Sequence, residues 1–416
     1  MTHDTDTMFP EKIRKLCVSI NGSESGVLIR ESQYVYSYDR EYPEQLPVGL
    51  FLSPDQMVHR SSDLFSVMDQ NLPEGYLFQR IKDFFPKQKI TDMHLLALIG
   101  DNGIGRLGFH LQGEGKRPSP PAISRDEILN SPDGVMVFDN LVRHYLSSGI
   151  GISGVQPKIM VPERATVPIP NLIVKAGSDE YEDQACNEFV CMSAAKNAQI
   201  KVPEFDLSHD GKMLVLDRFD VTSDHQRLGF EDVASLFGLH VRDRLSDRKY
   251  HGSYEDIATL LLSIGLPRED LEEFFTQVAF SVMVRNGDAH MKNFGVLYRS
   301  RNDIRLAPMY DVLTTAIYKY EKFGGGPIVV DNTLALRLMK QSRTKGYPTR
   351  KDLLSFGHLK CQVKKPELIL DRIAQAMNET LAQMKQDERI PRTLLDKLAA
   401  SWSTGLMYSP TPSRLR

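Results

Sequence analysis

A dense run of polar residues, Arg285–Asn293, separates two apolar stretches in the second half of the chain. The residues before it carry apolar side chains at helical spacing, and Phe294–Tyr298 after it is strand-like. The apolar positions before the run are Leu271, Phe274, Phe275, Val278, Val282 and Met283. A polar loop between two core elements is held rigidly, as a catalytic loop must be. Asn, Gly, Asp and Lys also gather in ordinary solvent-facing turns, which is the alternative interpretation.

The spacing inside this run is typical of phosphoryl transfer. Asp288 precedes Asn293 by five residues, which is the D-x-x-x-x-N pattern of protein-kinase catalytic loops. Transfer from ATP requires a carboxylate near the attacking hydroxyl, oxygen ligands for Mg²⁺ and a cation near the phosphate. Lys292 lies inside the run. Asp311 follows Asn293 by eighteen residues, where a kinase carries its main metal-binding carboxylate. The pattern predicts a kinase-type loop that uses ATP and Mg²⁺.

The composition limits the class of protein. The chain has 416 residues, 41 % hydrophobic and 25 % charged, which is ordinary for two or three globular domains. A net charge of −3 argues against broad binding to nucleic acid or membranes. Two basic stretches, Arg242–Lys249 and Lys340–Lys351, are interpreted as solvated faces, with DNA contact as the alternative.

Cysteine usage and hydropathy favour a cytoplasmic protein. The four cysteines have no C-x-x-C spacing, so we expect reduced thiols rather than zinc ligands or disulfides. The polar, acidic residues at the start of the sequence do not resemble a secretory signal. No apolar run is long enough to span a membrane. We therefore expect a cytoplasmic location and no membrane partner.

Local patterns divide the sequence into three regions. Residues 13–52 alternate in the manner of strands, with a turn at Asn21–Gly22, and short helical segments follow, so residues 1–113 should form a β-rich domain. Gly113–Pro121 is the clearest linker. Residues 123–227 mix helices and strands, whereas residues 228–408 are mainly helical. The expected fold class is α+β.

The turn Gly149–Gly154 fits the pattern G-x-G-x-x-G. A dinucleotide-binding site would need a strand before this turn and a helix after it. Here the order is reversed, because a helix-like segment precedes the turn and Gln156–Val161 after it is strand-like. This order suits a kinase-type loop whose glycines let backbone N–H groups approach the phosphates of ATP. A flexible surface turn is the alternative.

Asn171–Lys175 is an apolar strand that ends in a lysine. A kinase places such a lysine on the strand after the phosphate-covering loop, where it holds the α and β phosphates. A glutamate on a helix orients that lysine. Glu188 is the first candidate for this role and Glu182 the second. A surface lysine and an exposed glutamate are the alternatives.

Met213–Phe219 is another apolar strand, and it ends in a charged turn. In a kinase, the backbone of such a strand end forms the hinge that contacts the adenine of ATP. Asp217 and Phe219 would then line the pocket for the base.

These motifs, in this order, resemble the HipA family, the serine/threonine-kinase toxins of bacterial type II toxin–antitoxin modules. The resemblance covers nearly the whole chain, and the catalytic-loop signature is its most specific part. The matching segments are Asn71–Gly75, Gly100–Gly105, Ser153–Lys158, the strand ending in Lys175, Leu216–Asp220, Glu231–Leu239, Asn286–Asn293 and Pro308–Asp311.

The resemblance implies a HipA-like, protein-kinase-like fold. This fold has a β-rich N-terminal subdomain, a mixed nucleotide-binding middle and an all-helical C-terminal part. The resemblance also implies that Asp288 is the catalytic base, with Lys292 near the γ-phosphate. Asn293 and Asp311 would bind Mg²⁺.

A further set of residues would bind ATP. Glu188 would support this set through an ion pair with the ATP-binding lysine. The expected ATP-binding residues are Gly151, Ser153, Gly154, Val155, Gln156, Lys158, Lys175, Asp217, Phe219 and His290. For His290 the alternative is a structural role, as a buried histidine hydrogen-bonded to backbone.

The resemblance also implies partners. Family targets are aminoacyl-tRNA synthetases, whose phosphorylation stops translation and arrests growth. The antitoxin would be HipB-like, a helix-turn-helix dimer that neutralises the kinase and brings it to operator DNA. Because the chain keeps the N-terminal subdomain, a two-component module is expected. The alternatives are a small-molecule or lipid kinase and a catalytically silent protein that docks the antitoxin for repression.

One position departs from the best-known family members. They carry a serine two positions before the one that Ser153 occupies, and its phosphorylation ejects the glycine-rich loop. Here that earlier position is Gly151, so Ser153 is the expected autophosphorylation site. A phosphate there would add nearly two negative charges where the loop should hold ATP. The alternative is a small residue that merely fits the turn.

Overall fold

The computed structural model describes most of the chain. The described residues are 10–42, 46–73, 78, 81–82, 85, 87–113, 124–132, 134, 136–137, 140, 158–161, 171–177, 181–321, 328–330 and 332–410. Only the backbone is described for residues 158–161, 243–244 and 320–321. The five expected ATP-binding residues Gly151, Ser153, Gly154, Val155 and Gln156 lie outside the described residues.

The N-terminal region contains a five-stranded antiparallel sheet in the order β4-β3-β2-β1-β5. Its strands are β1 Lys15–Ile20, β2 Ser23–Arg30, β3 Tyr34–Tyr38, β4 Val58–Ser61 and β5 Leu107–His110. The β1–β2 hairpin turns at Asn21 and Gly22, whose φ angles of 51° and 80° suit the two-residue turn that Asn-Gly favours. Leu16, Val18 and Ile20 alternate along β1 and are buried. The prediction of a β-rich N-terminal region is confirmed.

In the described residues between β4 and β5 lie the short helices α1 Ser66–Asp69 and α3 Asp92–Ile99. Helix α3 packs on β1 and β5, and α1 packs on a helix of the C-terminal part, α7 Val233–Leu236. Helix α3 thus packs on part of the sheet, and α1 ties the N-terminal region to the C-terminal part.

The middle region contains a four-stranded antiparallel sheet in the order β6-β7-β9-β8. Its elements are α4 Arg125–Leu129, β6 Lys158–Val161, β7 Leu172–Ala176, α6 Gln184–Asn197, β8 Phe205–Leu207 and β9 Met213–Asp217. Helix α6 connects β7 to β8 and packs on β7, β8 and β9. Within β7, Leu172 pairs with Asp217 and Lys175 pairs with Leu214. Lys175 and Asp217 therefore lie toward opposite ends of the central strands.

The C-terminal part is mainly helical, as predicted. Its helices are α7, η1 Asp243–Tyr250, α8 Tyr254–Ser263, α9 Arg268–Met283, η2 Met291–Asn293, η3 Thr315–Ile317, α10 Arg350–Lys360, α11 Pro366–Met384 and α12 Arg392–Leu406. Helix α9 contacts α8, α10, α11 and α12, and its stripe of Phe274, Phe275, Val278 and Val282 is fully buried. The apolar periodicity before the polar run thus forms the centre of this part.

Strands accompany these helices, so the part is not helical throughout. They are β10 Gly229–Asp232, β11 Gly295–Ser300, β12 Asp303–Leu306, β13 Lys319–Glu321 and β14 Ile328–Val330. The first three form one antiparallel sheet and the last two form a hairpin. Strand β11 directly follows the polar run, and its backbone groups need partners that a helix cannot supply. Pairing with β10 and β12 satisfies them and fixes one end of the run.

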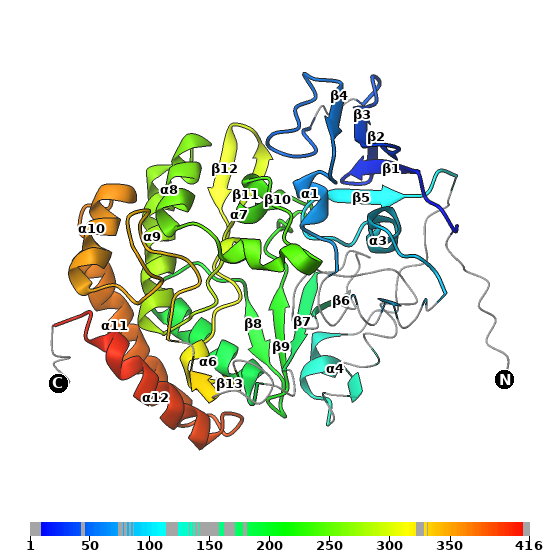
Figure 1. Cartoon of the computed structure of the whole chain (residues 1–416). Coiled ribbons are helices and arrows are strands. Elements are labelled where there is room, and N and C mark those ends of the chain that lie inside the picture. Colours follow the sequence, from blue (N-terminus) through cyan, green and yellow to red (C-terminus); the bar gives the residue numbers. More distant parts are fainter. Residues whose placement is uncertain are drawn as a thin grey trace.

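Figure 1 shows how the parts are arranged. The N-terminal sheet and the helices α10–α12 lie on opposite sides of the molecule, with the β7–β9 sheet between them. Among the described residues, no helix is long and apolar enough to cross a membrane.

Hydrogen bonds join the N-terminal domain to β10. The side-chain amide of Gln70 donates to the backbone oxygen of Phe230 at 2.7 Å and accepts the N–H of Asp232 at 2.9 Å. The carboxylate of Glu231 accepts the N–H of Leu50 at 2.6 Å. Because Gln70 and Glu231 are buried, these bonds are shielded from water and hold the domains in one orientation.

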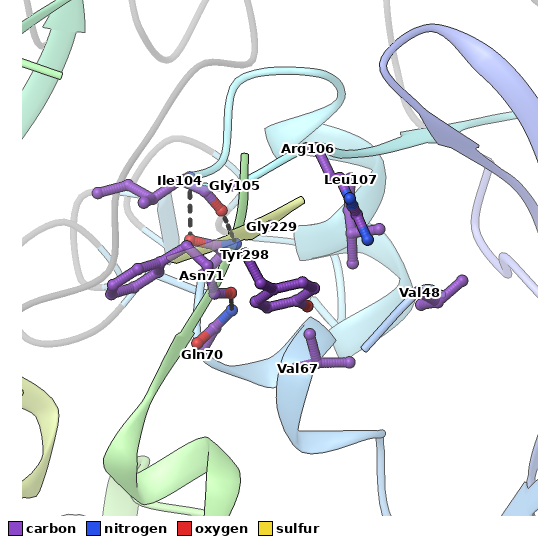
Figure 2. A pocket seen from close by; sticks show the side chains of 11 residues that line it. Val48, Val67, Gln70, Asn71, Ile104, Gly105, Arg106, Leu107, Gly229 and Tyr298 are labelled. Carbon is purple, nitrogen blue, oxygen red and sulfur yellow. Dashed lines mark hydrogen bonds between the residues drawn. The ribbon is translucent and has the colours of Figure 1, made fainter. Parts of the chain in front are cut away.

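A small cavity lies at this junction (Figure 2). Figure 2 shows Gln70 and Asn71 on one side of it and Tyr298 beside them. Arg106 also lines the cavity, and its guanidinium donates to the backbone oxygens of Pro47 at 2.9 Å and Arg299 at 2.8 Å. Hydrogen bonds of defined geometry as well as apolar contacts therefore hold the domains together at this junction.

Candidate active site

The polar run forms a loop that its own groups hold in place. Asp288 donates its N–H to Oδ1 of Asn286 at 3.0 Å, and its backbone oxygen accepts the N–H of His290 at 2.7 Å. The same N–H of His290 lies 3.0 Å from Oδ1 of Asn293. Asn286, His290 and Asn293 are buried. The interpretation of this run as an ordinary exposed turn is therefore wrong.

Two tyrosines outside the loop contact it. Tyr250 of η1 donates from Oη to Oδ1 of Asp288 at 2.8 Å. Tyr310, which precedes Asp311, donates from Oη to the backbone oxygen of Lys292 at 2.9 Å. Asp288 and Lys292 are nevertheless partly exposed, as groups that meet a substrate must be.

The ammonium group of Lys175 lies between two carboxylates, that of Glu188 on α6 and that of Asp311. Lys175 and Glu188 are 4 % and 2 % exposed, so the interpretation of both as surface residues is wrong. Glu182 instead forms an exposed ion pair with Lys397 at 3.2 Å. Glu188 is therefore the helical carboxylate that contacts the lysine.

The two carboxylates stabilise the protonated, charged form of Lys175. Burial by itself would lower the pKa of the ammonium, because a charge away from water is disfavoured. Asp311 and Glu188 act in the opposite direction and raise the pKa of Lys175 above its ordinary value. One cation between two carboxylates leaves an excess of negative charge, which favours a further cation beside Asp311.

Asp311 has the chemistry of a Mg²⁺ ligand. Its φ of 54° lies in the left-handed region. Aspartate adopts this conformation more often than most residues, but the surrounding structure must still enforce it. Mg²⁺ takes one or two carboxylates and completes its shell with phosphate oxygens and water. No group of three or more His, Cys, Asp or Glu side chains within the described residues could hold a metal. Asp311 therefore carries the type of oxygen donor that Mg²⁺ prefers, and the amide oxygen of Asn293 is of the same hard type.

Lys175 of β7 and Asp217 of β9 lie toward opposite ends of this strand pair. Asp217 pairs with Leu172, three residues along β7, or roughly 10 Å away at the rise of a strand. Lys158 of β6 pairs with Lys175 in the backbone register, and its side chain is outside the described residues. Because residues three apart on a strand face opposite sides of a sheet, the side chains of Lys175 and Asp217 lie on opposite faces.

Two contacts at this end were not expected from the sequence. The carboxylate of Asp217 forms an ion pair with Arg125 of α4. The ring of Phe219 stacks on Tyr310, with centroids 5.2 Å apart and planes 14° from parallel. Tyr310 precedes Asp311, so this stack connects Phe219 to the segment that carries Asp311.

His290 is buried within the loop, which suits a structural role for its side chain better than a role in binding ATP. Its ring packs edge-on against Tyr250, with centroids 5.1 Å apart. Burial, followed by the positive charges of Lys249 and Lys292, holds the pKa of the imidazole well below its ordinary value. The neutral ring is suited to packing and hydrogen bonding rather than to binding phosphate by charge.

Sequence reasoning missed a buried polar cluster behind the site. Asn187 of α6 exchanges two hydrogen bonds with the backbone of Thr314. The hydroxyl of Thr314 donates to the backbone oxygen of Val284 at 2.8 Å and accepts from Nε1 of Trp402 at 2.8 Å. Trp402 is the only tryptophan of the chain, and this rarity was the one signal that pointed to the cluster.

Comparisons with known family models match the chain in two segments. A model of the HipA N-terminal domain matches residues 16–110, and a model of the HipA-like C-terminal domain matches residues 150–385. The first match corresponds to the N-terminal sheet. The second includes Lys175, the polar loop and Asp311.

Two relatives are candidate kinases by name. The chain is 33 % identical over 161 residues to Y4dM of Sinorhizobium fredii, a match that covers 35 % of this chain and 38 % of that protein. It is 25 % identical over 266 residues to a protein of Haemophilus influenzae, which covers 60 % of this chain and 71 % of that protein. The match to Y4dM thus spans less than half of its length.

The fold matches a solved structure over almost the entire chain. HipA of the Shewanella oneidensis MR-1 toxin–antitoxin system, solved with HipB and its operator DNA, aligns with a TM-score of 0.62 and 17 % identity. The alignment covers 94 % of this chain and 96 % of that chain, and it shows a shared α+β, kinase-like fold. Because the C-terminal family model alone matches more than half of the sequence, the chain belongs to the HipA family.

Proposed function

We propose that this chain is an ATP- and Mg²⁺-dependent serine/threonine protein kinase and the toxin of a type II toxin–antitoxin module in the cytoplasm. The observation that carries the proposal is the contact of Lys175 with both Glu188 on α6 and Asp311, which lies 136 residues further along the sequence. Protein kinases require this lysine–glutamate pair beside a metal-binding aspartate. The candidate-kinase relatives support the same activity.

Asp288 is the proposed base. It accepts the proton of the acceptor hydroxyl while the hydroxyl oxygen bonds to the γ-phosphorus and the bond from that phosphorus to ADP breaks. Lys292, on the same loop, places a positive charge near the transferred phosphate. Most of the rate should come from positioning and electrostatic stabilisation, because the chemistry needs little covalent help.

The remaining residues would hold the nucleotide. Asn293 and Asp311 would bind Mg²⁺, which neutralises phosphate charge when present. Lys175 would bind the α and β phosphates, and Asp217 and Phe219 would lie at the base. The residues proposed to cover the phosphates are Gly151, Ser153, Gly154, Val155, Gln156 and Lys158, with His290 supporting the loop from within.

We assign three regions to these tasks. Residues 1–113 form the N-terminal domain, residues 123–227 the nucleotide-binding region and residues 228–408 the helical catalytic domain. The family models, which match residues 16–110 and 150–385, support the first boundary.

The proposed acceptor is an aminoacyl-tRNA synthetase, and the proposed antitoxin is a HipB-like helix-turn-helix protein that connects the kinase to operator DNA. The complex of the Shewanella HipA with HipB and operator DNA supports this partner. A phosphopeptide survey of host lysate, incubated with MgATP and the protein, identifies the acceptor. Lysate treated with the Asp288→Asn variant is the matched control.

The same variant tests the activity. Asp288→Asn keeps the shape of the side chain but removes the proton acceptor, so phosphate transfer from ATP should fall by about 10²- to 10⁴-fold with the fold unchanged. Asp303→Asn, on the exposed face of β12, should transfer phosphate like the wild type. Normal transfer by Asp288→Asn would refute the assignment. Label that appeared only in a small metabolite would favour a small-molecule kinase.

A further inference from the structure

Tyr250 contacts the residue proposed as the catalytic base. Its Oη donates to Oδ1 of Asp288 at 2.8 Å. The hydrogen bonds within the loop use the backbone N–H and backbone oxygen of Asp288, so they fix the main chain of this residue. The bond from Tyr250 instead acts on the carboxylate, and the terminal torsion of an aspartate is intrinsically soft.

Tyr250 is itself held by residues from both basic stretches of the sequence. Lys345 donates from Nζ to the backbone oxygen of Tyr250 at 2.8 Å. The ammonium groups of Lys249 and Lys345 lie 5.3 Å and 5.8 Å from the centroid of the tyrosine ring, within the range of cation–π attraction. The ring also forms a T-shaped contact with the ring of His290. Two basic stretches that had no role in the proposed function thus converge on one phenol.

We infer that Tyr250 is a positioning residue for phosphoryl transfer, an inference that rests on the proposed function. The phenol holds Oδ1 of Asp288 and thereby directs the second carboxylate oxygen, Oδ2, toward the acceptor hydroxyl. A base must lie within about 2.6–3.2 Å of the proton it accepts. A misplacement of about 1 Å can lower a rate by about 100-fold. Lys249 and Lys345 act through Tyr250, since they hold the ring and its backbone.

The inference predicts a specific kinetic pattern for Tyr250→Phe. This variant keeps the ring and its packing and removes only the hydroxyl that contacts Asp288. The kcat for transfer from MgATP, followed as ADP release together with labelling of the chain, should fall by about 10- to 100-fold. The KM for MgATP should stay within about twofold of the wild type, because the hydroxyl that is removed donates to Asp288 and the ring that packs against His290 is kept. The thermal midpoint should not change.

Two further variants complete the experiment. Tyr36→Phe removes another tyrosine hydroxyl, one that contacts Ser25 in the N-terminal sheet, and should leave kcat unchanged. Lys345→Met removes the donor to the backbone of Tyr250 but keeps the phenol, so it should lower kcat in the same direction by a smaller factor. If Tyr250→Phe does not fold, the kcat of Lys345→Met tests the inference in its place.

The outcomes separate this inference from the proposed function. A wild-type protein that transfers no phosphate to any acceptor overturns both. An active wild type with an equally active Tyr250→Phe variant overturns the positioning role alone. A rise in KM that accompanies a lower thermal midpoint also overturns it, because that pattern indicates a structural role.

Discussion

Asn187 and Thr314 exchange two hydrogen bonds behind the candidate active site. Nδ2 of Asn187 donates to the backbone oxygen of Thr314 at 3.1 Å, and the N–H of Thr314 donates to Oδ1 of Asn187 at 3.0 Å. Asn187 directly precedes Glu188, and Thr314 follows Asp311 by three residues. The exchange therefore fixes the relative position of the two carboxylates that contact Lys175.

Loss of this exchange should weaken nucleotide binding. Asn187→Ala leaves buried backbone groups of Thr314 without partners, which should cost about 1–3 kcal/mol of stability. We expect the KM for MgATP to rise by about tenfold, because Glu188 and Asp311 are no longer held together. Asn197→Ala is the matched control on the same helix, since Asn197 contacts Thr380 and Gln383 on another side.

Trp402 provides the readout for this variant. It donates to the hydroxyl of Thr314 and is the only tryptophan, so its fluorescence reports on the segment that carries Asp311. The emission of Asn187→Ala without nucleotide should differ from that of the wild type. An unchanged emission together with an unchanged KM would contradict the coupling.

Removal of the buried cation should destabilise the fold in a way that Mg²⁺ partly reverses. Lys175→Met leaves the carboxylates of Glu188 and Asp311 facing each other, which should cost about 3–5 kcal/mol and abolish ATP binding. Mg²⁺ should then raise the thermal midpoint of Lys175→Met more than that of the wild type, because it replaces the missing charge. NaCl at equal ionic strength is the salt control.

Lys196→Met is the matched variant for this measurement. Lys196 lies on α6 and forms an exposed ion pair with Glu204, so its loss should change stability by less than about 1 kcal/mol. Equal effects of Mg²⁺ on all three proteins would argue against a metal site at Asp311.

The junction between the domains should lose stability as pH rises. Burial raises the pKa of Glu231 to about 7, although Leu50 and Tyr298 donate hydrogen bonds to it. Between its ordinary pKa and this value, the folded state binds more protons than the unfolded state, so stability falls from about pH 4.5 to about pH 7. The loss from this group should be on the order of 3 kcal/mol.

Glu231→Gln should remove this dependence. The glutamine keeps an oxygen for Leu50 and Tyr298 and cannot ionise, so urea unfolding at pH 5 and pH 8 should give more similar free energies than in the wild type. The exposed Glu388→Gln is the control and should behave like the wild type. An unaltered pH dependence in Glu231→Gln would show that another group is responsible.

Incubation with MgATP should add one phosphate to Ser153. Its negative charge would repel the phosphates of ATP, so activity should decline as intact-mass spectrometry shows the modification to accumulate. Ser153→Ala should take up no phosphate and should stay active for longer. Ser148→Ala, five residues earlier, is the control. A phosphate on Ser153→Ala in the same amount would place the modification elsewhere.

Local patterns were sufficient for much of the architecture. The Asn21–Gly22 hairpin, the strand ending in Lys175 and the buried helix before the polar run could be predicted, because turn chemistry and apolar periodicity depend on neighbouring residues. The strands β10 and β12 were not anticipated within the C-terminal part. Their partner, β11, makes hydrogen bonds to segments far away in the sequence, and such pairing leaves little local trace.

The sequence by itself determined the chemistry of the candidate site, since Asp288, Asn293 and Asp311 are recognisable from their types and spacing. Only the tertiary structure decided which groups meet. It placed Glu188 rather than Glu182 on Lys175, and it joined Asp217 to Arg125. The physical reason is that residue type and spacing specify what a side chain can do, whereas a contact such as that of Arg125 with Asp217, 92 residues away, depends on how helices and sheets pack.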